Sequence, residues 1–113
     1  MRESTPKFVQ GAFAFNGSGY DAPAPIASHT VGDGHRAQMV YLRAGNSSPE
    51  MVVVSVSKDG VPMRLFPIGA KGAVHVPLAV VEDIDPGTKL DLAIAAPAGV
   101  SGTVVIDFGL VEI

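Results

Sequence analysis

The chain has 113 residues, of which 47% are apolar and 17% are charged, and its net charge is −3. It has no cysteine, which excludes disulfides, thiolate metal sites and cysteine nucleophiles. The lysines and arginines are dispersed and form no basic run, so we do not expect a nucleic-acid partner. No apolar run approaches the roughly 20 residues of a membrane-spanning helix, so we do not expect a membrane partner either.

The charged fraction lies below the roughly 25% of an average globular domain. A small domain has proportionally more surface and should be more polar than average. The surplus apolar surface therefore predicts contact with another copy of the chain or with a larger assembly.

The first residues, 1–7, are predicted to form a flexible leader. They lack the apolar core of a signal peptide, so we expect the protein in the cytoplasm or in an assembled particle. Residues 8–113 are predicted to form one domain, which is a typical length for a single domain.

The first predicted strand covers residues 8–15, where Val9, Phe13 and Phe15 share a face. Residues 20–35 are irregular, because prolines and glycines recur in them, but residues 26–31 can form a short edge strand. The next strand covers residues 36–43, with Gln38, Val40 and Leu42 on one face and Met39 and Tyr41 on the other.

Residues 51–57 alternate cleanly, with Val52, Val54 and Val56 pointing inward. Asp59-Gly60 then predicts a type I′ turn, because both central residues of that turn need a positive φ. The return strand covers residues 61–68, with Met63 and Leu65 on one face, and its two prolines predict an edge position.

Residues 73–81 form another predicted strand, with Val74, Val76 and Leu78 on the apolar side. Residues 88–113 are predicted to form two adjacent strands. Their inward residues recur at every second position: Leu90, Leu92, Ile94, Val104, Ile106, Phe108 and Leu110.

The chain therefore shows about seven or eight short strands, separated by turn residues, and no helical periodicity beyond a single turn. This pattern predicts an all-β fold, a two-sheet antiparallel β-sandwich of jelly-roll or immunoglobulin-like type. Parallel pairing would need crossover helices, which the sequence lacks.

The candidate binding residues lie in the irregular region and are His29, Asp33, His35 and Arg36. Both imidazoles and the carboxylate could meet a divalent ion if the segment folds back on itself. The alternative is that Asp33-Gly34 is a simple turn with solvated histidines. We favour the turn and expect neither a metal nor a cofactor.

No segment carries a catalytic motif, so we expect a non-catalytic structural or accessory subunit. It would assemble with itself or decorate a larger complex through an apolar sheet face. The residues Val53, Val105 and Val111 support this, because they are apolar on strand faces that a monomer would normally fill with polar groups.

The alternative is a module that binds a carbohydrate or another small molecule. Residues 102–108 resemble the last strand of jelly-roll sugar-binding modules, a resemblance that covers one strand. Exposed aromatic faces form sugar platforms, and the chain has no tryptophan and only Tyr20 and Tyr41. The third possibility is a small enzyme using His29, Asp33 and His35.

Overall fold

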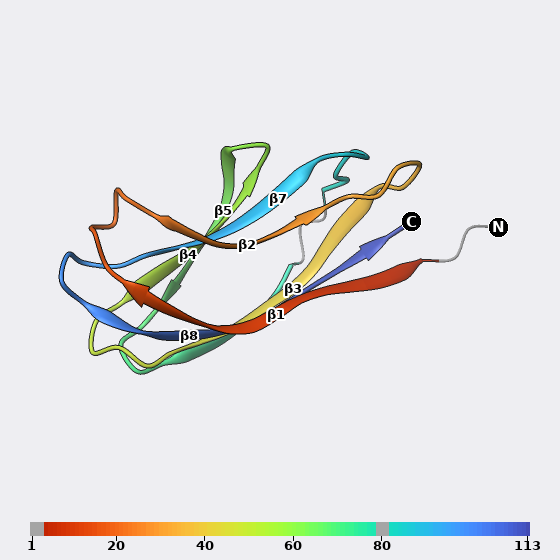
Figure 1. Ribbon diagram of the computed structural model, residues 1–113. Helices are drawn as coiled ribbons and strands as arrows, with labels where there is room; N and C mark the ends of the chain where they lie inside the picture. Colours follow the sequence, from red (N-terminus) through yellow and green to blue (C-terminus); the bar gives the residue numbers. More distant parts are fainter. Residues whose placement is uncertain (1–3, 79–81) are drawn as a thin grey trace.

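A computed structural model describes residues 4–78 and 82–113, which form two antiparallel four-stranded sheets packed face to face (Figure 1). The predicted all-β sandwich is confirmed, and the described residues contain no helix. The strands are β1 (Thr5–Asn16), β2 (Ala24–Thr30), β3 (Ala37–Asn46), β4 (Val52–Lys58), β5 (Val61–Ile68), β6 (Ala73–Pro77), β7 (Lys89–Ala95) and β8 (Ser101–Glu112).

One sheet has the order β1-β8-β3-β6 and the other has the order β2-β7-β4-β5. The prediction that the two C-terminal strands are adjacent is wrong, because β7 and β8 lie in different sheets. The turn after β7 contains Gly99 at φ 82°, and it carries the chain from one layer to the other. The predicted edge positions of β2 and β5 are confirmed.

The core lies between the two sheets and is built from the inward positions of the alternating strands. Val54, Leu92, Ile106 and Phe108 are all buried, as the alternation predicts. Val74, Val76 and Leu78 are half-buried and pack against this core from β6 and the residue after it. The period of two therefore identified the inner face of most strands correctly.

A β-bulge in β3 overturns part of the predicted pattern. The pairing of β3 with β8 shifts register between Met39 and Tyr41, so Val40 becomes an extra residue. Met39 and Leu42 are both buried, whereas Val40 is 47% exposed. The prediction that Val40 and Leu42 share a face is wrong, because the bulge reverses the alternation between them.

A second bulge lies where β4 pairs with β5. Val56 pairs with Arg64 and Ser57 pairs with Pro62, which leaves Met63 as the extra residue. Met63 packs against the core while Leu65 is 66% exposed, so the prediction that they share a face is wrong.

The predicted turn between β4 and β5 is confirmed, with Asp59 at φ 48° and Gly60 at φ 84°. The turn is held against the neighbouring strand by two hydrogen bonds. The Asp59 N–H donates to the Lys89 carbonyl, and the Lys89 N–H donates to Asp59 Oδ1, each at 2.9 Å.

The strand β1 begins earlier than predicted. Thr5 pairs with Glu112 and Lys7 pairs with Leu110, so residues 5–7 belong to the sheet and not to a leader. Residues 1–3 of the predicted leader, and residues 79–81 of the predicted strand 73–81, lie outside the described residues. Across 4–78 and 82–113, no helix is long and apolar enough to span a membrane.

Candidate functional site

The predicted binding residues lie at one end of the sandwich, where β2 meets the end of β8. His29 Nε2 lies 2.6 Å from Glu112 Oε2, and the Gly32 N–H donates to Glu112 Oε1 at 3.0 Å. Glu112, not Asp33, is therefore the carboxylate that contacts His29. The pair joins an edge strand of one sheet to a central strand of the other.

The Glu112 carboxyl is buried, and burial by itself would raise its pKa. The hydrogen bonds from Gly32 and His29, with the charges of His29 and Lys7, outweigh burial and hold the pKa of Glu112 below its ordinary value. These contacts explain Glu112 as a structural tie between the sheets.

The other predicted binding residues do not converge on His29 as a metal site would require. Asp33 and His35 line a shallow pocket of about 350 Å³ together with Glu112. Arg36 forms an ion pair with Asp83 at 3.6 Å. Among the residues that the structure describes, no group of three His, Asp or Glu side chains could hold a metal ion.

A row of polar side chains crosses the outer face of the β1-β8-β3-β6 sheet. Gln10 on β1 pairs with Asp107 on β8, Asp107 pairs with Arg43 on β3, and Arg43 pairs with His75 on β6. Paired residues of antiparallel strands point to the same face. The register therefore places one polar side chain on each of the four strands, side by side.

Asp107 is the centre of this row. Its Oδ1 accepts hydrogen bonds from Gln10 Nε2 at 2.9 Å and from the Tyr41 hydroxyl at 2.8 Å, and its Oδ2 lies 3.9 Å from Arg43. The Gln10 and Tyr41 hydrogen bonds lower the pKa of Asp107, and the nearby cationic groups add to this. The hydrogen bond from the Tyr41 hydroxyl to Asp107 raises the pKa of Tyr41, because it stabilises the protonated phenol.

The Tyr41 ring covers Gly109 on the neighbouring strand. A Cβ built on Gly109 would lie only 2.2 Å from Tyr41 Cε2 and 2.7 Å from its Cζ. The ring also makes an edge contact with His75, with centroids 6.0 Å apart and planes at 89°. The glycine therefore allows Tyr41 to lie down over the sheet beside the polar row.

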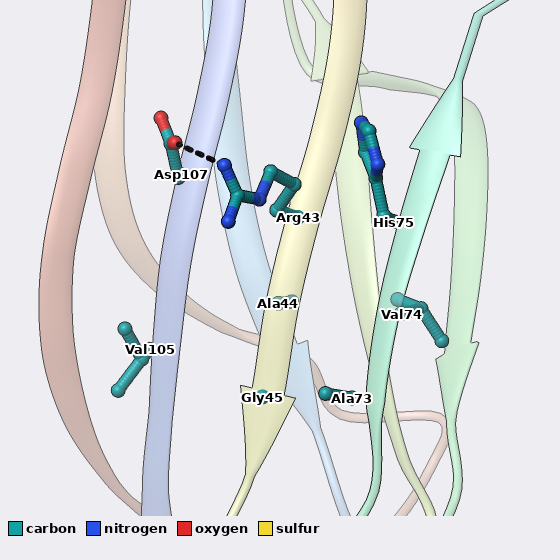
Figure 2. A pocket seen from close by; sticks show the side chains of 8 residues that line it. All are labelled: Arg43, Ala44, Gly45, Ala73, Val74, His75, Val105 and Asp107. Atoms are coloured by element: carbon teal, nitrogen blue, oxygen red, sulfur yellow. Dashed lines mark ion pairs between the residues drawn. The ribbon is translucent and has the colours of Figure 1, made fainter.

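A hollow of about 470 Å³ adjoins the row, because Gly45 and Ala73 at the next outward positions of β3 and β6 have little or no side chain (Figure 2). Val105 pairs with Gly45, and Gly45 pairs with Ala73, directly beside Asp107, Arg43 and His75. Figure 2 shows Arg43 reaching from β3 toward Asp107 on β8, and His75 standing on β6 across the hollow. The hollow therefore has polar groups along one side and a floor of small residues.

The outer face of the β2-β7-β4-β5 sheet has a different hollow, of about 430 Å³. Prolines, Tyr20 and Leu65 line it together with Ser55 and Ala93. The Tyr20 hydroxyl donates to the Met51 carbonyl at 2.8 Å, which fixes the ring at the edge of this hollow.

The three predicted interface valines do not form one patch. Val105 is 57% exposed and Val111 is half-buried, both on the outer face of the β1-β8-β3-β6 sheet. Val53 is half-buried and lines the hollow on the opposite face of the molecule.

Sequence reasoning missed the polar row of Gln10, Arg43, His75 and Asp107, and it missed Tyr41 beside the row. The available signal was that Gln10, His75 and Asp107 lie at outward positions of the predicted alternation. Their meeting depends on the register of four strands, which are far apart in sequence, and on the bulge that turns Tyr41 outward.

No family model and no curated protein matches this chain. Its fold is similar to that of the CBM36-1 domain of a multidomain xylanase from the hindgut metagenome of Trinervitermes trinervoides. The TM-score is 0.58 at 16% identity, over 95% of this chain and 96% of that chain.

The fold is also similar to part of the structure of infectious bursal disease virus, Gt strain, with a TM-score of 0.54 at 12% identity. That match covers 96% of this chain but 31% of the viral chain. Both likenesses show the β-sandwich fold.

Proposed function

We propose that this chain is a non-catalytic module that binds a saccharide on the outer face of the β1-β8-β3-β6 sheet. The observation that carries the proposal is the position of Tyr41. Its ring lies over Gly109 and its hydroxyl is fixed by Asp107. The polar row lies beside the ring, and the hollow lies on the other side of the row.

The chemistry of the face suits a polyhydroxylated ligand. A sugar presents C–H groups on its ring faces and hydroxyls around its edge, so it pairs with an aromatic face and with polar side chains in one plane. Tyr41 provides the aromatic surface. Arg43 provides fixed donors, and His75 provides one donor and one acceptor when it is neutral.

The face is ordered before any ligand arrives. Asp107 holds Tyr41 and Gln10 through hydrogen bonds, and the sheet fixes the backbone of all four strands. A preformed site loses less conformational entropy on binding, which improves affinity. The extensive likeness in fold to the CBM36-1 domain also supports a carbohydrate-binding role.

Affinity electrophoresis through native gels containing xylan, glucan, galactan or mannan tests the proposal. We expect at least one polysaccharide to retard the wild-type chain and to retard Tyr41→Ala much less. Gly109→Ala should have the same effect, because its new Cβ displaces the Tyr41 ring. Leu65→Ala, on the opposite face, is the control and should migrate like the wild type.

If no polysaccharide retards the wild type, the proposal is wrong. It is also wrong if Leu65→Ala abolishes retardation while Tyr41→Ala preserves it. Circular dichroism of each variant shows whether the fold is intact.

A structural subunit that assembles into a larger complex is the second candidate function. The specific observation in its favour is apolar exposure on both outer faces, at Val105 and Leu65. The likeness to part of a viral structure is consistent with it. In this case Val105→Lys or Val53→Lys should weaken assembly more than folding, which light scattering and thermal melting can compare.

A further inference from the structure

The four edge strands of the sandwich differ sharply in how they resist pairing with another chain. An edge strand presents unpaired N–H and C=O groups, and proteins usually protect it with proline, charge, a bulge or short length. The strand β6 has only five residues and ends at Pro77. The strand β2 carries Pro25 and a register irregularity, and β5 carries two prolines, Arg64 and a bulge.

The strand β1 lacks this protection over most of its length. It has twelve residues and pairs with β8 without any register shift. Its proline and its one charged residue, Pro6 and Lys7, both lie at its beginning. Phe8, which follows them, is 57% exposed.

The apolar side chains of β1 are also incompletely covered. Val9 and Phe13 point toward the core and pack against it, but each remains only half-buried. In the part of the chain that the structure describes, β1 pairs with β8 alone, so its other edge has no strand beside it. A further strand at this edge would complete the burial of both residues.

We propose that two copies of this chain pair through β1 in an antiparallel, two-fold symmetric arrangement centred on Gly11. Residues that pair across antiparallel strands must point to the same face, so only registers of matching parity are allowed. In the register centred on Gly11, Val9 lies opposite Phe13 of the partner subunit. Both then stay on the core side of one continuous sheet.

A second copy suits this edge because β1 is complementary to itself. Lys7 lies opposite Phe15 of the partner subunit, so the pairing opposes no like charges. On the outer face, Phe8 lies opposite Ala14 of the partner subunit, where a large side chain meets a small one. A two-fold axis repeats each of these contacts, which is typical of soluble homodimers.

The dimer has a consequence that rests on the proposed function. Pairing at β1 creates one eight-stranded sheet with the order β6-β3-β8-β1-β1-β8-β3-β6. The polar row of each subunit then lies on the same outer face of this sheet, and one polysaccharide could contact both rows. Two linked sites increase the apparent affinity for a polymer without any new contact within each site.

Like charges introduced on the outer face of β1 test the pairing. Phe8→Lys combined with Ala14→Lys places lysine opposite lysine at two positions of the dimer. Phe8→Glu combined with Ala14→Glu places glutamate opposite glutamate. Both wild-type residues are exposed in the single chain, so the monomer fold should tolerate the changes.

Sedimentation at micromolar concentration should give twice the chain mass of 11.6 kDa for the wild type. Each double variant should sediment as a monomer, and an equimolar mixture of the two should form a dimer. The matched control is Val61→Lys combined with Leu65→Lys on the β5 edge, which should remain dimeric.

The inference is overturned if the wild type is monomeric, if both β1 variants remain dimeric, or if the β5 control dissociates equally. It is also overturned if the mixture of folded β1 variants stays monomeric. Affinity electrophoresis separates this result from the proposed function. A monomeric wild type that polysaccharide still retards refutes the pairing alone, and a dimer that no polysaccharide retards refutes the function alone.

Discussion

Asp107 has a lowered pKa because its carboxylate accepts hydrogen bonds from Gln10 and Tyr41. Tyr41→Phe removes one donor without removing the ring, so we expect the pKa of Asp107 to rise toward its ordinary value. Asp107→Asn should conversely lower the pKa of Tyr41 toward 10.0. Carboxyl and tyrosine NMR titrations measure the two shifts, and unchanged values in both variants would contradict this description of the row.

The direction of the shift sets the pH range in which Asp107 supports the fold. A carboxyl whose folded pKa is lowered contributes stability above its unfolded pKa and loses that contribution as the pH falls through the folded pKa. The polar row should therefore be intact at neutral pH and weaken in acid.

Replacing Glu112 should destabilise the fold, because its carboxylate is buried and joins the two sheets. Glu112→Ala removes the hydrogen bonds with His29 and Gly32, and each bond to a charged group contributes about 1.5–3 kcal/mol. We expect the free energy of unfolding to fall by at least about 1.5 kcal/mol at pH 7. The exposed Glu50→Ala is the control and should change it by less than about 0.5 kcal/mol.

The pH dependence of the same variant follows from the lowered pKa of Glu112. The difference in free energy of unfolding between the wild type and Glu112→Ala should be complete above the ordinary glutamate pKa of 4.5. It should disappear as the pH falls through the lowered pKa of Glu112. Urea unfolding at several pH values measures this. An advantage that persists in strong acid would show that the pair does not act through the ionised carboxylate.

At the scale of single elements, the β4–β5 turn requires glycine at position 60 because of its backbone conformation and not because of a lack of space. A Cβ there would meet nothing within 4 Å, but φ is 84°, where an L residue costs about 1–2 kcal/mol. Gly60→Ala should therefore destabilise the protein by that amount. Gly69→Ala is the matched control, because its Cβ also meets nothing and its φ lies outside the left-handed region. Equal stability of the two variants in thermal melts would contradict the type I′ assignment.

The sequence predicted regular elements well and irregular ones poorly, for a physical reason. Alternation identifies the inward residues wherever a strand is regular, as at Val54, Leu92 and Phe108. A bulge inserts one residue and reverses that alternation, and neither Val40 nor Met63 carries a local signal of it. The Asp59-Gly60 turn was predictable because its chemistry is local.

At the scale of the whole molecule, the proposed binding face could not be predicted from the sequence, because it depends on the register between strands. The pairings that place Gln10, Arg43 and His75 in one row with Asp107 join residues that are distant in sequence. The assignment of β7 and β8 to different sheets is likewise a choice of topology that alternation does not determine. On regular strands, sequence analysis could identify which residues point outward, but not which of them meet.

Chemical-shift mapping tests the proposed binding face most directly. Backbone amide shifts would be followed while the wild-type chain is titrated with an oligosaccharide of the polysaccharide that retards it in the native gel. We predict that the largest changes cluster at Tyr41, Arg43, His75 and Asp107 on the β1-β8-β3-β6 face. Changes confined to Tyr20, Ser55 and Leu65 on the opposite face, or no changes at saturating ligand, would contradict this assignment.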